Sequence, residues 1–225
     1  MPTEPTNLSK RLEADGYAML PGLVPESLVA AAATELREAF SAADTIQVDS
    51  DGINITTLNG ADLLSRSEAT GDLYTLVLDH LRAELGEVFE VEDQRIGISA
   101  NLLTAESNQF RFHFDRNQLT VIIYISASSN FPLVLYPLMR DDPRHFPEDA
   151  PPPVKGRDEE QAVKVYPRPG LVIAFWGRRT IHGIRFEAPQ DGQSIAPRYS
   201  LQFAFDLEDS DYRGENYYGG DLSRS

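Results

Sequence analysis

A histidine and an aspartate stand two positions apart in the strand-like segment QFRFHFDRNQLTVIIYIS, as His113 and Asp115. Side chains at i and i+2 leave the same face of a β-strand, so this imidazole and this carboxylate point toward one place. A second histidine, His182, follows an apolar strand and a Gly/Arg turn in LVIAFWGRRTIHGIRF. If the two strands face each other in an antiparallel barrel, the three side chains can bind one metal ion. The alternative is an ordinary pair of hydrogen-bonded strand residues and a turn histidine.

The type of ligand narrows the choice of metal. The chain contains no cysteine, so thiolate sites are excluded and a metal must bind to nitrogen and oxygen atoms. Two neutral nitrogens and one anionic oxygen cover one face of an octahedron, which suits Fe(II) and leaves three positions for a bidentate cosubstrate and dioxygen. Zinc more often binds three histidines, two histidines with a glutamate, or thiolates. We therefore predict non-haem iron, with manganese and cobalt still open.

A third element lies downstream, where Arg198 and Ser200 share one face of the predicted strand RYSLQFAFD. An arginine fork next to a hydroxyl is suited to binding a carboxylate through two parallel hydrogen bonds. A keto acid that chelates iron at one end needs such an anchor at the other, and a buried arginine without a partner would be costly. A structural ion pair is the alternative for Arg198, whereas Arg185 lies at an odd spacing from His182 and so on the opposite face.

Further polar and aromatic residues are candidates for the same site. Asn101 and Tyr124 lie on predicted strands and are expected to hydrogen-bond the cosubstrate. Arg111 shares the predicted strand face of His113, and the nearby positive and amide side chains suit a substrate carboxylate. The predicted substrate-contacting residues are Arg111, Arg116, Asn117 and Trp176, with core packing as the alternative for Trp176 and simple solvation as that for the arginines.

The segments around these residues predict a mostly β fold with helices before the sheet. A short strand and a Pro/Gly turn precede a helix that begins at Pro25 or Glu26, with an apolar stripe at Leu28, Ala32 and Leu36, and a second helix is expected over about 68–86. Without crossover helices a parallel sheet is disfavoured, so an antiparallel sandwich or barrel of jelly-roll type is expected. Eight strands follow in RIGISANLL, QFRFHF, LTVIIYIS, FPLVLYPL, QAVKVYP, GLVIAFW, HGIRFE and RYSLQFAFDL.

Length and composition predict one domain. With 225 residues and 41% hydrophobic content the chain can bury one sizeable core. We divide it into a helical N-terminal part of about 1–90, a β core of about 95–207 and a flexible polar tail, 208–225. The loop 139–161 is Pro-rich and acidic, and either this loop or the tail is a candidate lid over the site.

Charge and hydropathy restrict the partners. A formal net charge of -15 disfavours nucleic acid and anionic membrane surfaces, because the field of the chain repels a polyanion. The sequence has neither a signal-like N-terminus nor an apolar run of the roughly 18 to 20 residues that span a bilayer, so a cytoplasmic location is expected. A small-molecule partner remains, and the sequence leaves monomer and homodimer open.

The ordered combination of His113-x-Asp115, His182 and Arg198-x-Ser200 resembles the Fe(II)/2-oxoglutarate-dependent dioxygenases, whose core is a double-stranded β-helix of jelly-roll, cupin-like type. The phrases LTVIIYIS and RPGLVIAFWGRRTIHGI belong to this likeness. The segment DGYAMLPGLVPESLVAAAATELREAF is similar to the opening of phytanoyl-CoA-hydroxylase-like and prolyl-hydroxylase-like members. The resemblance covers about 16–207.

The resemblance implies Fe(II), 2-oxoglutarate and O2 as the reagents of an oxygenase that converts 2-oxoglutarate to succinate and CO2 while it oxidises an unactivated C–H bond. The intact carboxylate of Asp115 favours hydroxylation or another oxidation over halogenation, with desaturation and cyclisation left open. The compact size favours a free amino acid or a natural-product intermediate as substrate. The alternatives are an iron oxidase or cupin-like metalloenzyme without 2-oxoglutarate, and a non-catalytic β-barrel binding protein.

Overall fold

The computed structural model describes residues 8–42, 46–50, 53–91, 97–139, 162–189 and 194–207. Its helices are α1 (Leu8–Asp15), α2 (Glu26–Ala42), α3 (Gly60–Arg66) and α4 (Glu68–Leu85). Its strands are β1 (Tyr17–Met19), β2 (Ile46–Ser50), β3 (Ile53–Asn59), β4 (Phe89–Glu90), β5 (Ile98–Leu103), β6 (Gln109–His113), β7 (Leu119–Tyr124), β8 (Leu133–Tyr136), β9 (Val163–Val165), β10 (Val172–Trp176), β11 (Ile181–Ile184) and β12 (Arg198–Asp206).

Local sequence signals set the ends of the two long helices. The Ser67 hydroxyl accepts a hydrogen bond from the Thr70 N–H at 3.1 Å and caps α4, and Gly86 ends the helix at a φ of 87°. Helix α2 begins at Glu26, after Pro25. Both predicted helices are confirmed, although Val29 rather than Leu28 is the fully buried residue of the first turn of α2.

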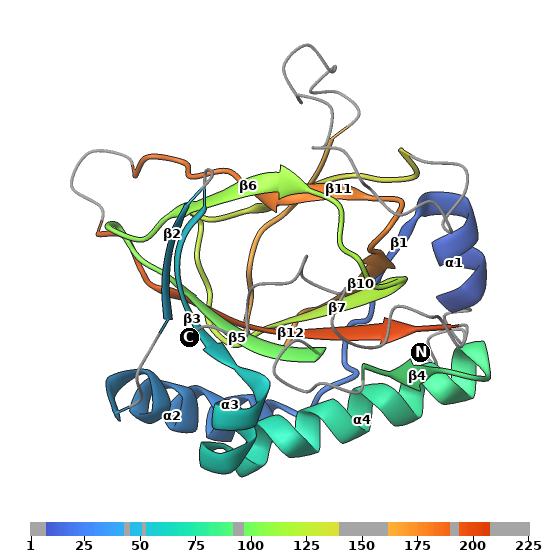
Figure 1. Cartoon of the computed structure of the whole chain (residues 1–225), viewed down its shortest axis with the longest axis horizontal. Helices are drawn as coiled ribbons and strands as arrows, with labels where there is room; N and C mark the ends of the chain where they lie inside the picture. Colours follow the sequence, from blue (N-terminus) through green and yellow to red (C-terminus); the bar gives the residue numbers. More distant parts are fainter. Residues whose placement is uncertain are drawn as a thin grey trace.

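The strands form one antiparallel sheet that curls on itself (Figure 1). Its order is β1-β10-β7-β12-β5-β3-β6-β11-β8-β9, with β2 paired to β3 and β4 paired to β12. Strand β3 pairs with both β5 and β6, so the sheet turns a corner there. All eight predicted strands are present and every pairing is antiparallel, which confirms the expected jelly-roll architecture.

Apolar side chains fill the space between the two layers of the curled sheet. Ile122 and Tyr124 from β7, with Phe175 from β10, pack against Leu133 and Leu135 from β8. Strand residues alternate between this interior and the outer face. The interior is therefore where side chains from distant strands meet.

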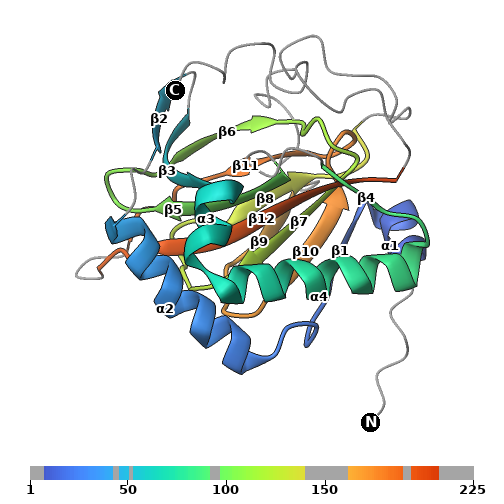
Figure 2. The ribbon, with the colours of Figure 1, turned by 60° about the horizontal axis from the view of Figure 1, so that its bottom comes forward.

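Helices cover the outer face of the larger layer. Figures 1 and 2 both show α2, α3 and α4 lying along the side formed by β12 and its neighbours. Leu73, Val77 and Leu81 of α4 belong to one buried cluster with Leu201 and Phe203 of β12. This cluster fixes the position of β12 through the face that the helices cover, and the opposite face of the strand is directed into the interior of the curled sheet.

Several elements were not predicted from the sequence. Helices α1 and α3 are short, and β4 has two residues. The β2–β3 pair lies within the part expected to be helical, yet β3 belongs to the core sheet. Most of the loop 139–161 and all of the tail 208–225 lie outside the described residues, so their expected role as lids is not addressed. Within the described ranges, none of the helices is long and apolar enough to cross a bilayer.

Candidate metal centre

The predicted triad converges where β6 and β11 pair. His182 is the direct register partner of His113, and Asp115 follows β6 by two residues. The Oδ1 atom of Asp115 lies 3.3 Å from Nε2 of His113 and 3.5 Å from Nε2 of His182. The three ligand atoms lie within 4.8 Å of one another. Ligands on one face of an octahedron, with bonds of about 2.1 Å, are about 3 Å apart, so the three side chains fit one metal ion.

Backbone carbonyls orient both imidazoles. The Nδ1 atom of His113 is 2.9 Å from the Arg111 carbonyl oxygen, and Nδ1 of His182 is 3.3 Å from the Thr180 carbonyl oxygen. A ring whose Nδ1–H donates to a carbonyl presents its Nε2 lone pair to a metal. Both Nε2 atoms face the Asp115 carboxylate, which is the orientation that three ligands of one shared metal ion require.

A hydroxyl fixes the carboxylate. Thr120 Oγ1 donates to Oδ2 of Asp115 at 2.5 Å, and Asn117 Nδ2 donates to Thr120 Oγ1 at 2.8 Å. This leaves Oδ1 directed at the two histidines. Asp115 is consequently set up as a ligand through one oxygen.

The electrostatics of the triad match metal binding. Burial alone would raise the pKa of Asp115, but His182, His113 and the hydrogen bond from Thr120 lower it to about 2. Burial lowers the pKa of His182 to about 4, against the opposing attraction of Asp115. At neutral pH the carboxylate is therefore ionised and His182 is neutral, which are the states that coordinate metal.

Two glycines allow the chain segments to approach each other at the centre. A Cβ on Gly177 would lie 2.6 Å from the Asn117 carbonyl oxygen and 2.9 Å from the Asp115 Cβ. A Cβ on Gly183 would lie 3.0 Å from the Phe112 ring. A side chain at either position would separate the strand or loop that carries a ligand from its neighbour.

A cavity extends from His182 to three of the predicted cosubstrate residues, Asn101, Arg198 and Ser200. Its empty volume, counted out to open solvent, is about 370 Å³. Asn101 and Tyr124 are the two register partners of Ser200, so the three residues form one row across β5, β12 and β7. The lining residues are Asn101, Phe110, Ile122, Leu133, His182, Gly183, Ile184, Arg198, Ser200 and Gln202.

Arg198 and Tyr124 carry polar atoms without partners in this region. Arg198 is 2% exposed, its Nη1 donates to the Phe131 carbonyl oxygen at 3.0 Å, and its Cζ lies 4.9 Å from the centre of the Tyr124 ring. The Arg198 Nε and the Tyr124 hydroxyl are buried and have no hydrogen-bond partner among the residues that the structure describes. Burial lowers the pKa of Arg198 and raises that of Tyr124. Within the described ranges no carboxylate pairs with this guanidinium, which is the environment expected of a site for an anion.

Two predicted substrate residues take other roles. Of the two expectations for Trp176, pocket lining and core packing, the structure shows the second: its indole Nε1 donates to the Leu12 carbonyl oxygen at 2.7 Å and the ring packs against the helix-side core. Strand alternation turns Phe175 inward instead, with its ring centre 4.7 Å from that of His182. Asn117 is buried and donates to Leu119 and Thr120, so it holds the loop that carries Asp115.

The arginines near His113 lie away from the cavity lining. The register between β6 and β11 shifts between His182 and Ile184, so that Phe110 pairs with Ile184 while His113 pairs with His182. This irregularity places Phe110, rather than Arg111, at the cavity. The Arg111 side chain is exposed and that of Arg116 is half-buried. A role in substrate binding stays a prediction for both.

Sequence reasoning missed Thr120 and Phe175. Thr120 is five residues from Asp115, and a loop separates them. Because a loop has no regular repeat, the sequence pattern does not predict their contact. Phe175 could have been predicted. The apolar residues around it indicate a strand buried on both faces, and consecutive residues of a strand point to opposite faces, so Phe175 and Trp176 cannot both face the site.

Comparison with known proteins supports the fold. No protein-family model matches the chain, and no curated protein matches its sequence. Among solved structures, the non-heme alpha ketoglutarate dependent epimerase SnoN from nogalamycin biosynthesis matches with a TM-score of 0.67 and 17% identity, over 88% of this chain and 81% of that chain. A Pseudomonas putida prolyl-4-hydroxylase matches with a TM-score of 0.58 and 16% identity, over 89% of this chain and 97% of that one.

A third structure is HygX from Streptomyces hygroscopicus with nickel, 2-oxoglutarate and hygromycin B bound. It matches with a TM-score of 0.62 and 12% identity, over 91% of this chain and 88% of that chain. The agreement extends over nearly the whole of each protein. The chain therefore has the double-stranded β-helix fold that the Fe(II)/2-oxoglutarate-dependent oxygenases share.

Proposed function

We propose that the protein is a non-haem Fe(II)/2-oxoglutarate-dependent oxygenase that oxidises an unactivated C–H bond of a small molecule. The observation that carries this proposal is a His-Asp-His set whose His182 lines the same cavity as Arg198, a buried arginine that has no carboxylate partner among the described residues. A cupin-like metalloenzyme without a keto acid does not require such a cation, and a non-catalytic binding protein does not require a three-residue metal set beside it.

The residues divide the work as follows. His113, Asp115 and His182 would hold Fe(II), and the ion, once bound, supplies the oxidising chemistry by which O2 and 2-oxoglutarate give succinate, CO2 and an oxidised substrate. Arg198 would bind the far carboxylate of 2-oxoglutarate through a charge-assisted fork, with Ser200 beside it. The balance is RH + 2-oxoglutarate + O2 to ROH + succinate + CO2 for a hydroxylation.

Tyr124 and the apolar walls of the cavity support the same assignment. The unpartnered Tyr124 hydroxyl can donate to the carboxylate that Arg198 binds, and Asn101 lines the cavity from the opposite side of Ser200. Ile122 and Leu133 surround this end with apolar surface, which excludes water and strengthens each polar contact.

The substrate is expected to approach from the side of His113. The His113 side chain is 21% exposed, whereas that of His182 is 4% exposed, so the solvent-accessible side of the triad is the side of His113. A small-molecule substrate is supported by two structural neighbours whose ligands are nogalamycin RO and hygromycin B, although another was solved with a peptide fragment. We infer a natural-product intermediate or a free amino acid.

Succinate formation tests the proposal. The iron-loaded protein is incubated with 2-oxoglutarate and O2, with and without a panel of amino acids and natural-product scaffolds, beside the His113→Ala variant. The expected result is succinate that depends on His113 and rises with one substrate class. Absence of any His113-dependent succinate would contradict the oxygenase assignment, and a flat response to amino acids alone would remove that substrate class.

A further inference from the structure

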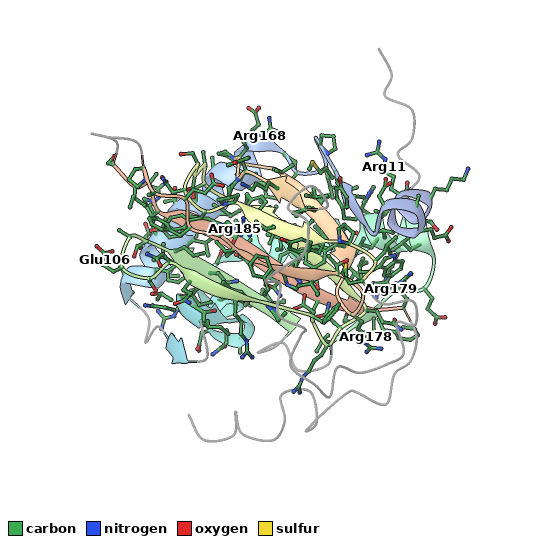
Figure 3. All side chains as sticks on the ribbon, turned by 90° about the horizontal axis from the view of Figure 1, so that it is seen from above. Arg11, Glu106, Arg168, Arg178, Arg179 and Arg185 are labelled. Carbon is green, nitrogen blue, oxygen red and sulfur yellow. The ribbon has the colours of Figure 1, made fainter. Side chains whose placement is uncertain are left out.

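Arg178 and Asp206 form a buried ion pair beside the loop that carries Asp115. Their side chains are 2% and 6% exposed, and Arg178 Nη2 lies 3.4 Å from Asp206 Oδ1. Figure 3 places Arg178 and Arg179 side by side, at the end of the sheet away from Glu106. A buried ion pair seldom adds net stability, since desolvation of both charges offsets their attraction, so stability alone is a weak reason for its presence.

The pair grips the segment that carries Asp115. Arg178 Nε donates to the Arg116 carbonyl oxygen at 2.5 Å, and Asp206 Oδ1 accepts from the Gln118 N–H at 2.8 Å. Gln118 Oε1 in turn accepts from the N–H of Leu207 at 2.5 Å. The residues on both sides of Asn117 are thus tied to the ion pair.

Backbone hydrogen bonds extend this grip to the ligand itself. The Asp115 N–H donates to the Gly177 carbonyl oxygen at 2.9 Å, and the Gly177 N–H donates to the Gln118 carbonyl oxygen at 2.8 Å. The turn that contains Gly177 and Arg178 runs on through Thr180, whose carbonyl orients His182. One turn therefore positions two of the three predicted metal ligands.

We propose that Arg178 and Asp206 are positioning residues for the metal centre. Resting on the proposed function, this inference assigns them the task of holding the Asp115 loop so that Oδ1 faces both histidines. Asp206 also ends β12, whose first residue is Arg198, so the same strand carries the cosubstrate anchor and the support of the aspartate ligand. Loss of the pair lets the loop shift without removing any ligand.

The test compares metal affinity with stability. The Arg178→Met/Asp206→Asn double variant removes both charges of the pair together and keeps an oxygen for the Gln118 N–H. Glu35→Gln is the control, because Glu35 also accepts partly buried hydrogen bonds, from Ser67 and Ala69, between α2 and α4. Mn(II) affinity is measured by electron paramagnetic resonance of the free ion, and unfolding of the metal-free proteins by calorimetry.

The expected result is Mn(II) binding about 10- to 100-fold weaker in the double variant, the loss typical of outer-shell partners, with parent-like affinity in Glu35→Gln. An affinity within threefold of the parent, or an equal loss in the control, would overturn the positioning role. If the double variant does not fold, Asp206→Asn alone is used, with the same criteria. A parent that binds Mn(II) no better than His113→Ala would instead overturn the proposed function, so the two failures are distinguishable.

Discussion

Arg198 offers a test in which one substitution has different effects with and without 2-oxoglutarate. In the Arg198→Met variant the desolvated cation is removed, while the Phe131 carbonyl oxygen loses its donor. An unsatisfied buried acceptor costs about 1–3 kcal/mol, and relief of an unpaired buried charge offsets it. We therefore expect the free energy of unfolding of the 2-oxoglutarate-free protein to change by less than about 2 kcal/mol.

The effect on cosubstrate binding is larger. Truncation of one partner of a buried charge pair costs about 2–5 kcal/mol, which is roughly 30- to 5,000-fold in dissociation constant. At a concentration 100 times the parent dissociation constant, 2-oxoglutarate stabilises the parent by about 2.7 kcal/mol. If the variant binds 100-fold more weakly, the same concentration stabilises it by about 0.4 kcal/mol.

Thermal unfolding in the presence of Mn(II) measures both effects. A chain of this length shifts its melting temperature by about 2–4 °C per kcal/mol, so 2-oxoglutarate should raise that of the parent by about 5–11 °C and that of Arg198→Met by about 1–2 °C. Arg185→Met is the control, since Arg185 does not line the cavity, and it should keep the full shift. Equal shifts in parent and Arg198→Met, or a loss of more than about 4 kcal/mol without 2-oxoglutarate, would refute the reasoning.

Three further predictions concern the metal centre and its surroundings. Thr120→Val removes the donor to Asp115 and should weaken Mn(II) binding about 10- to 100-fold, measured by electron paramagnetic resonance of the free ion. Unchanged Mn(II) affinity would contradict a positioning role for the hydroxyl. Because the pKa of His182 is about 4 in the folded chain and about 6.5 when unfolded, the unfolded state binds more protons between these values. Denaturant titrations of the metal-free protein should therefore show stability falling by about 3 kcal/mol from pH 7 to pH 4, a slope that His182→Gln should reduce. Trp176→Phe should lower the melting temperature through loss of the hydrogen bond to the Leu12 carbonyl oxygen, with no change in 2-oxoglutarate affinity. A changed 2-oxoglutarate affinity would indicate that Trp176 contacts the cosubstrate.

The convergence of His113, Asp115 and His182 could be predicted because it follows from strand periodicity and order. His113 and Asp115 are two positions apart, and an antiparallel sheet without crossover helices brings the β11 segment against β6. The strands themselves were recognisable from alternating or continuous apolar runs between turn residues. For these features, local pattern and global fold agree.

The placement of the side chains expected to contact substrate could not be predicted in the same way. The placement of Arg111 assumed an uninterrupted strand, but the register shift between β6 and β11 brings Phe110 to the cavity. A bulge adds one residue and changes which side chains face inward, and its position depends on the partner strand. The role of Asn117 depends on a loop whose contacts come from Gly177 and Thr120, which are distant or aperiodic in sequence.

Alternation along β12 explains how a site with several buried polar groups exists in a stable fold. Arg198, Ser200 and Gln202 face the cavity, while Leu201, Phe203 and Phe205 pack under α4 and its neighbours. The apolar half of the strand fixes its position through hydrophobic burial, so the polar half need not find its own partners to hold the backbone in place. The Nε of Arg198, unpartnered among the described residues, is therefore tolerated, because its cost is offset on the opposite face of the same strand; binding of the proposed anion would recover that cost.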